Sequence, residues 1–204
     1  MASSTYSGEY ACVILTCEQP PAGFGLNRLA TIFQNNPGFS VAARPILLYP
    51  DPILKTPAAP VLPGDPVITP IIQDMLDTLQ ASPGVALAAP QIGRLVRIIV
   101  VDVSRKKGEA GHGLVVLLNP CLKNQERGRI IREGCLSVPD YTGNVLRYEQ
   151  TVVEGFSPEG TPVTLIASGF EALAFQHELD HLNGMLFLDR IQSLDTDLFR
   201  RKSL

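Results

Sequence analysis

The sequence predicts an α+β fold in which antiparallel sheets pack around a C-terminal helix that carries a metal-binding motif. Three observations predict it. An early segment spaces its apolar side chains like one face of a helix. Several runs rich in Val, Ile and Leu follow, separated by polar loops that contain glycine, as strands commonly are. A last helical segment carries paired histidines, and the order helix, strands, helix indicates that helices and strands are segregated.

Length and composition indicate one globular domain. The 204 residues are 45% hydrophobic and 18% charged, which excludes a disordered chain. The net charge of -3 lacks the strong basic excess of a general nucleic-acid binder. Apolar runs such as residues 10–15 and 114–118 are far shorter than the roughly 20 residues of a membrane span. The four cysteines form no dense pattern, which favours a reducing, cytoplasmic location of the bacterial type.

Residues 1–43 differ from the rest and are expected to form a disordered extension. They are rich in Ser, Gly, Asn and Pro, without sustained periodicity. Targeting to an organelle stays open, although transit peptides are rich in Arg and poor in acids, and this stretch has one Arg and two acidic residues. The catalytic domain is expected over residues 44–204.

The first elements of the domain follow from proline and capping signals. Residues 45–52 contain prolines that each disfavour helix in the preceding residue, so an extended segment is expected. Asp65 and Pro66 are a typical N-cap and first position of a helix whose apolar residues run to Leu79. The sequence Ser82-Pro83-Gly84 ends this helix.

Strands and a second helix follow. Strands are expected at residues 97–103 and 114–119, on either side of a polar loop that contains glycine. Two more, at residues 151–156 and 161–167, flank a hairpin signal at residues 157–160. The last helix is expected at residues 169–183 and ends at Gly184.

The second helix carries an H-E-x-x-H motif at residues 177–181. Side chains four residues apart on a helix point the same way within about 40°. The imidazoles of His177 and His181 therefore supply half of a tetrahedral metal site. Glu178 follows the first imidazole and can reach a water at the metal.

The third ligand decides the class of enzyme. A metzincin would have a further His where this chain has Phe187, and a thermolysin-like enzyme needs a later Glu, but none follows Glu178. Cys135, between two strand-like segments, is the favoured third ligand, although a buried cysteine is commonly a core residue.

Three motifs, in the same order, resemble the peptide deformylase family. Residues 84–91 are similar to its G-x-G-L-A-A-x-Q motif, residues 133–137 to E-G-C-L-S, and residues 176–184 to Q-H-E-x-D-H-L-x-G. The resemblance covers about residues 44–190. It implies hydrolytic removal of the formyl group from the N-terminal methionine of nascent polypeptides, with release of formate. Ala86 departs from the family, which usually has glycine beside the bound peptide at this position.

The resemblance implies a role for each residue of the metal site. Cys135, His177 and His181 would hold one divalent metal, ferrous iron in the cell, with zinc, nickel or cobalt as substitutes. Glu178 would take up a proton as general base and return it as general acid.

The same resemblance implies the substrate contacts. The Gln91 amide and the Leu136 backbone N–H would stabilise the oxyanion, although a loop-capping role is the alternative for Gln91. The other residues expected at the substrate are Val85, Ala86, Arg147, Leu173 and Ala174. Helix core is the alternative role for the last two, and a surface ion pair is the alternative for Arg147.

Two other functions stay open. One is a metallopeptidase of a different H-E-x-x-H family, whose metal would not need Cys135. The other is a deformylase-like protein that binds formylated chains without turnover, which only Ala86 supports. Formylated nascent peptides are the expected partners, and the basic residues 200–202 allow transient ribosome contact; neither direct nucleic-acid binding nor a membrane is expected. His112, in a polar loop, is expected to face solvent rather than a metal.

Overall fold

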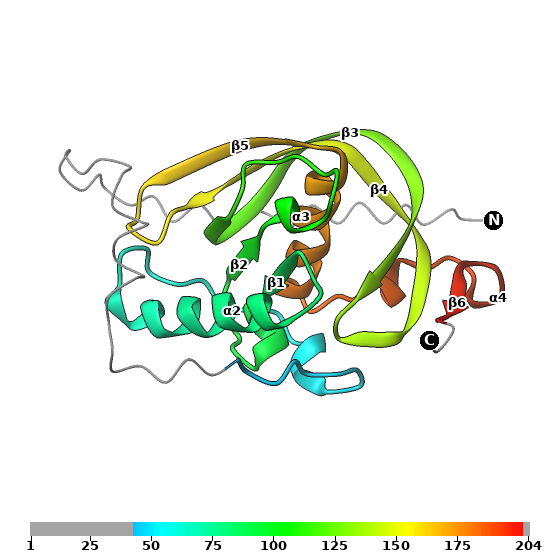
Figure 1. Ribbon diagram of the computed structural model, residues 1–204, viewed down its shortest axis with the longest axis horizontal. Coiled ribbons are helices and arrows are strands. Elements are labelled where there is room, and N and C mark those ends of the chain that lie inside the picture. Colours follow the sequence, from blue (N-terminus) through cyan, green and yellow to red (C-terminus); the bar gives the residue numbers. More distant parts are fainter. Residues whose placement is uncertain (1–42, 202–204) are drawn as a thin grey trace, which may run out of the picture. The chain divides into compact units, whose positions relative to one another are not determined.

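A computed structural model describes residues 43–201. The extension expected at the N-terminus, up to residue 42, and Lys202 of the basic tail lie outside the described residues. In chain order the helices and strands are α2 (Thr69–Ala81), β1 (Ala86–Ala88), β2 (Ile98–Val101), β3 (Val115–Cys135), β4 (Val138–Phe156), β5 (Pro162–Ser168), α3 (Gly169–Leu182), α4 (Leu194–Asp197) and β6 (Leu198–Arg200). The strands form one antiparallel sheet in the order β1-β2-β3-β4-β5, with β6 paired to β4 (Figure 1). The predicted α+β class is confirmed.

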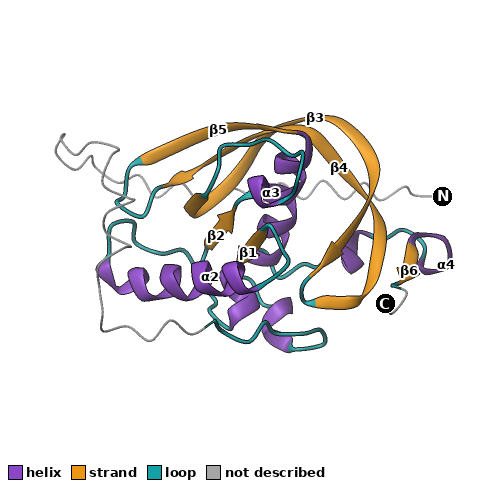
Figure 2. Cartoon of the chain, in the orientation of Figure 1, coloured by secondary structure: helices purple, strands orange, loops and turns teal. Residues whose placement is uncertain are grey.

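The short strands β1 and β2 are covered on both faces, by α3 on one side and by α2 on the other (Figure 2). Successive side chains of a strand point to opposite faces. Ile99 and Val101 accordingly pack in the cluster with α3, whereas Ile98 and Val100 pack in the cluster with α2. Burial on both faces explains why β2 is a continuous apolar run.

The hairpin of β3 and β4 is much longer than the sequence predicts. Strands were expected only at residues 114–119 and 151–156, but the ladder continues to a turn after Cys135. Residues 123–130 are all exposed and largely polar, so the apolar pattern that marks a strand is missing there. Their strand conformation comes from pairing with β4 rather than from burial.

Both helix predictions are confirmed, with one adjustment. Asp65 accepts a hydrogen bond from the Val67 N–H at 2.9 Å, as an N-cap does, but the turn it caps is a 3-10 turn, and α2 begins at Thr69. The helix α3 ends at Leu182, and Gly184 has a φ of +69°. Among the described residues, no helix is long and apolar enough to cross a membrane.

The glycine after α3 lets the segment around Lys55 pack against the end of the helix. A Cβ on Gly184 would lie 2.8 Å from the Lys55 carbonyl oxygen, and every close neighbour is backbone. Gly108 has a similar φ of +87° but nothing within 4 Å of its Cβ position. Of these two glycines, Gly184 alone combines a left-handed conformation with a close approach of two backbones.

Gly184→Ala should destabilise the fold more than Gly108→Ala. A left-handed conformation costs an L-residue about 1–2 kcal/mol, which applies to both variants. Overpacking adds about 1–3 kcal/mol at Gly184 alone. Urea unfolding of the two variants measures the difference, and equal losses of stability would show that the contact with Lys55 relaxes freely.

Candidate functional site

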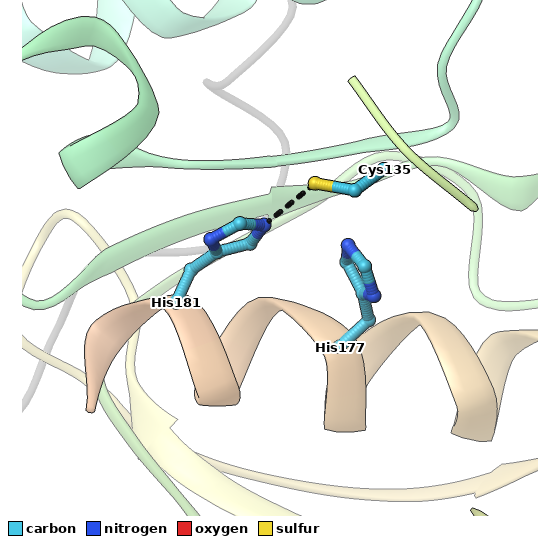
Figure 3. Close-up of side chains that lie close together, drawn as sticks. All are labelled: Cys135, His177 and His181. Carbon is cyan, nitrogen blue, oxygen red and sulfur yellow. Dashed lines mark hydrogen bonds between the residues drawn. The ribbon is translucent and has the colours of Figure 1, made fainter. Parts of the chain in front are cut away.

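Two imidazoles and one thiol meet where α3 passes the end of β3 (Figure 3). His177 and His181 lie one turn apart on α3, with ring centroids 5.0 Å apart. Cys135 is the last residue of β3, and its Sγ lies 3.1 Å from Nε2 of His181. The three donor atoms, here called the donor cluster, all lie within 4.8 Å of one another.

The donor cluster fits a divalent metal. Metal bonds of about 2.3 Å to sulfur and about 2.0–2.1 Å to nitrogen place the ligand atoms of a tetrahedral site roughly 3.3–3.6 Å apart. The three donor atoms, which lie within 4.8 Å of one another, would therefore have to move somewhat closer together to bind the metal. Nδ1 of His177 lies 3.1 Å from Oε1 of Glu133, which leaves Nε2 as the nitrogen available to a metal. A carboxylate that holds the other ring nitrogen is the usual neighbour of a metal-ligating histidine.

The turn between β3 and β4 fixes the position of the Cys135 sulfur. The Ser137 N–H donates to Sγ at 3.4 Å, and Nε2 of Gln91 lies 3.8 Å from the same sulfur. Gln91 is held at both ends of its amide. Nε2 donates to Oγ of Ser137 at 3.2 Å, and Oε1 accepts from the Ala88 N–H at 2.9 Å. The amide therefore stands beside the donor cluster in one orientation.

The charges of the donor cluster depend on one another. Burial acts to raise the pKa of the Cys135 thiol, but the imidazoles of His181 and His177 outweigh it and hold that pKa well below its usual range. Burial acts to lower the pKa of His177, whereas Cys135 and Glu133 raise it well above its ordinary value. The surroundings of Cys135 therefore favour the thiolate that metal binding requires.

Glu178 projects from α3 beside the donor cluster. Its side chain is buried, and within residues 43–201 its Oε2 has no hydrogen-bond partner. Burial raises the pKa of this carboxyl to about 7, against the opposing effect of the His177 and His181 imidazoles. A buried carboxyl without a partner lowers stability and is typical of a functional site.

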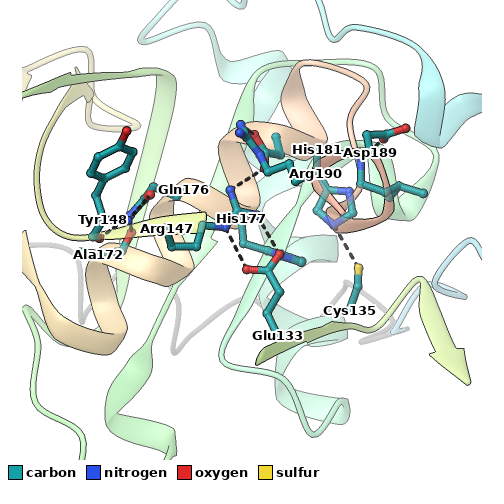
Figure 4. A network of polar contacts seen from close by, with 12 residues as sticks. Glu133, Cys135, Arg147, Tyr148, Ala172, Gln176, His177, His181, Asp189 and Arg190 are labelled. Carbon is teal, nitrogen blue, oxygen red and sulfur yellow. Dashed lines mark hydrogen bonds and ion pairs between the residues drawn. The ribbon is translucent and has the colours of Figure 1, made fainter. Parts of the chain in front are cut away.

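A chain of buried charges beside the donor cluster joins β3, β4 and α3 (Figure 4). The Arg147 guanidinium on β4 donates to both oxygens of Glu133 on β3, at 2.9 and 2.7 Å, and to Asp180 on α3 at 2.6 Å. Asp180 also accepts from Arg190. Burial acts to raise the pKa of Glu133, but Arg147 and His177 lower it to about 2. Glu133 is thus anionic and holds the His177 ring on one side and Arg147 on the other.

The donor cluster opens into a cleft of about 930 Å³. His181 lies behind the wall of this cleft and is only 1% exposed. The other predicted site residues on the wall are Val85, Ala86, Gln91, Cys135, Leu136, Leu173, Ala174, His177 and Glu178. The structure therefore brings together, around one cleft, three sequence segments that lie far apart in the chain.

Comparison with known proteins decides the family. The family model described as Polypeptide deformylase matches residues 43–197. The chain belongs to the peptide deformylase family. The peptide deformylase of Syntrophobacter fumaroxidans is 44% identical over 157 residues, which are 77% of this chain and 91% of that protein. The one from Halothermothrix orenii is 44% identical over 148 residues, 72% of this chain and 93% of that protein.

Solved structures agree with this family assignment. A peptide deformylase from Legionella pneumophila has a TM-score of 0.69 at 38% identity and covers 75% of this chain and 88% of its own. An Acinetobacter baumannii peptide deformylase, solved with Met-Ala-Ser bound, has a TM-score of 0.69 at 34% identity and covers 74% and 100%. Deformylases of this family are metal-dependent hydrolases that remove the N-terminal formyl group of nascent polypeptides. The metallopeptidase of a different H-E-x-x-H family, one of the functions that the sequence left open, is thereby set aside.

Arg147 and Ala86 are two of the residues that the sequence places at the substrate. The structure corrects the prediction that Arg147 contacts the substrate. Its side chain is 2% exposed and is absent from the cleft wall. Its N–H groups donate to Glu133 and Asp180 instead. The alternative, a surface ion pair, fails for the same reason. The Ala86 methyl packs in the core with α3 while β1 keeps its pairing with Val101, so the fold accommodates the departure from glycine.

Sequence reasoning missed some partners of the deformylase site. Glu133 and Asp180 stand inside the recognised motifs, so charged residues beside the ligands were the available signal. His112 was expected to face solvent, and its side chain is 41% exposed, but its ring Nδ1 and its backbone N–H both lie 2.8 Å from the buried Glu171 carboxylate. The two residues are 59 positions apart, and no local pattern links them.

Arg147→Met should destabilise this deformylase by about 3–5 kcal/mol, because it leaves Glu133 and Asp180 as buried charges without their shared partner. Arg129→Met is the matched control, since Arg129 pairs with Glu149 at the surface and its side chain is 58% exposed. Loss of an exposed pair costs about 0–1 kcal/mol. Urea unfolding compares the two variants, and similar midpoints would contradict the importance given to the buried network.

Proposed function

We propose that this cleft is where the chain removes the formyl group from formyl-methionine at the N-terminus of nascent polypeptides. One observation carries the proposal: Cys135 and His177 of the donor cluster line the same cleft as Glu178, a buried carboxyl whose Oε2 has no hydrogen-bond partner within residues 43–201. Each residue role below extends the family assignment to a position in this chain.

Cys135, His177 and His181 are the proposed ligands of one divalent metal. One thiolate and two imidazoles suit ferrous iron or zinc, and we propose ferrous iron in the cell, with zinc, nickel or cobalt as substitutes. Such a metal, with one open position, supplies a nucleophilic water at neutral pH and polarises the formyl carbonyl. Glu133 supports this site by holding Nδ1 of His177.

Glu178 is the proposed proton carrier. Its side chain lines the cleft beside the donor cluster, where the carboxylate can accept a proton from the attacking water and return it to the leaving amine. Gln91 is the proposed oxyanion donor, because its Nε2 is directed to the donor cluster while its Oε1 is occupied by the Ala88 N–H. The Leu136 N–H, at the turn that carries the ligand, is the proposed second donor.

The methionine side chain is proposed to lie against the apolar part of the cleft. Val85 and Ala86 form one side of it, and Leu173 and Ala174 on α3, one turn before His177, form another. An acyclic, flexible thioether packs well against such a surface. The Met-Ala-Ser found in the Acinetobacter baumannii relative supports a methionyl peptide as the ligand of this cleft.

The substrate class also suggests partners and place. We propose that the chain works where formylated polypeptides are synthesised, in a bacterial-type cytoplasm or, if residues 1–43 direct it there, in an organelle. Transient ribosome contact through the basic residues at the C-terminus is part of this proposal, and Arg200 and Arg201 are the described members of that tail.

The ligand role of Cys135 can be tested with cobalt. Cobalt-substituted protein should show a sulfur-to-metal charge-transfer band in the near ultraviolet, and Cys135→Ser should lose this band together with most formate release. Cys121→Ser is the control, because Cys121 lies on β3 outside the donor cluster. Full activity and an unaltered spectrum in Cys135→Ser would place the third ligand elsewhere. Metal analysis after anaerobic purification identifies the native ion.

The roles of Glu178 and Gln91 predict different kinetic losses. Glu178→Ala should keep one metal per chain yet lose nearly all formate release, because the carboxylate is no ligand. Gln91→Ala should lower kcat by about 100- to 1000-fold with little change in KM, since the oxyanion exists only near the transition state. Loss of metal from Glu178→Ala, or a change confined to KM in Gln91→Ala, would contradict these assignments.

A further inference from the structure

The wall of the cleft carries more basic than acidic residues, although the whole chain has a net charge of -3. The basic residues on the cleft wall are Lys106, Arg129, Arg132 and Arg201, and the acidic ones are Glu109, Glu133 and Glu178. Glu133 is paired with Arg147 and with His177, and its side chain is 10% exposed. The excess of positive charge is therefore not cancelled by the acidic residues of the donor site.

Two of the four basic groups already have carboxylate partners. Lys106 lies 3.4 Å from Glu109, and Arg129 lies 2.8 Å from Glu149. No carboxylate of residues 43–201 lies within ion-pair distance of the other two. Arg132 instead stacks over the Phe199 ring, 3.4 Å from its centroid. Arg132 and Arg201 are thus the guanidinium groups that can serve a ligand of the cleft.

The chain places Arg201 at the cleft through the strand that precedes it. β6 pairs with residues 141–143 of β4, and the Arg201 N–H continues this pairing by donating to the Asp140 carbonyl at 2.8 Å. The ladder of β3 and β4 is irregular just there, between Gly134 and Cys135. A bulge of this kind re-aims the side chains of the strands that meet at it.

The Arg201 guanidinium rests on the backbone of the ligand strand. Its Nη2 occupies the space that a Cβ on Gly134 would need, so the absence of a side chain at Gly134 makes room for the guanidinium. Gly134 directly precedes Cys135, the proposed metal ligand. The positive charge of Arg201 is therefore held on the cleft wall, beside the residue that precedes the proposed metal ligand.

We propose that Arg201, supported by Arg132, selects substrates with an acidic side chain in the first three residues after the formyl-methionine; this rests on the proposed function of the cleft. An extended peptide advances about 3.3 Å per residue, so these residues pass within reach of an arginine beside the ligand strand. The guanidinium binds a carboxylate with two parallel hydrogen bonds. Arg201 is a specificity residue in this scheme and takes no part in proton transfer.

The test compares three peptides that differ in one side chain. The peptides are formyl-Met-Ala-Asp-Ala, formyl-Met-Ala-Lys-Ala and formyl-Met-Ala-Ala-Ala. All are amidated at the C-terminus, because a terminal carboxylate would be a second source of negative charge. A parallel set moves the varied residue to the second and the fourth position. Formate release from the neutral peptide reports the proposed function by itself, and the Asp-to-Lys ratio of kcat/KM reports the selection.

The metal-loaded full chain should prefer the Asp peptide about 3- to 5-fold, the size expected of a partly exposed ion pair. Salt should reduce this ratio because it screens exposed charges. Arg201→Ala should bring the ratio close to one, and Arg201→Glu should invert it. Arg200→Glu is the matched control: Arg200 is exposed, is not on the cleft wall, and on a strand points opposite to its neighbour.

Each outcome decides the inference. A ratio that inverts in Arg201→Glu and stays unchanged in Arg200→Glu supports it. If Arg201→Glu and Arg200→Glu changed the Asp-to-Lys ratio equally, the selection would be a general effect of net charge and the role of Arg201 would be refuted. The absence of an Asp preference at all three peptide positions would also overturn the inference. No formate release from the neutral peptide by the unaltered chain would instead refute the proposed function.

Discussion

The active-site architecture depends on one buried guanidinium. Arg147 on β4 binds Glu133 on β3 and Asp180 on α3, and so joins the strand that ends at Cys135 to the helix that carries both histidines. The buried guanidinium is stabilised by both carboxylates, and each carboxylate is stabilised by the guanidinium. If one of the three elements shifted alone, it would leave a buried charge without its partner. The donor cluster, whose donor atoms lie within 4.8 Å of one another, is thereby held in place by charged residues outside it.

Local signals allowed most of the secondary structure and the common direction of the two imidazoles of the donor cluster to be predicted. The spacing of His177 and His181 fixes their common direction as soon as the segment is helical, because an α-helix turns 100° per residue. Gly184 ends that helix for an equally local reason, its positive φ. Both predictions depend only on residues within a turn or two of one another, where backbone geometry leaves few alternatives.

What the sequence could not predict involves residues far apart in the chain. The middle of the β3–β4 hairpin carries no apolar alternation because its residues are exposed, so only the partner strand reveals it. The burial of Arg147 depends on carboxylates 14 and 33 positions away, and a lone arginine in the sequence does not indicate such partners. Placement of Arg201 beside Gly134 likewise requires β6 to pair with β4. A strand of three residues is too short to show a recognisable apolar pattern in the sequence.

The turn that ends β3 has a consequence for the order of folding. Cys135 pairs with Val138 across a two-residue connection, so the loop entropy lost in placing it is small and the tip of the hairpin can form early. His181 lies 46 positions from Cys135 and reaches it only when α3 docks. A metal bound by both Cys135 and His181 would join the hairpin tip, which forms locally, to α3, which docks later. Its binding free energy would then slow unfolding by holding α3 on the hairpin, so the ion would govern the lifetime of the native state as well as its chemistry.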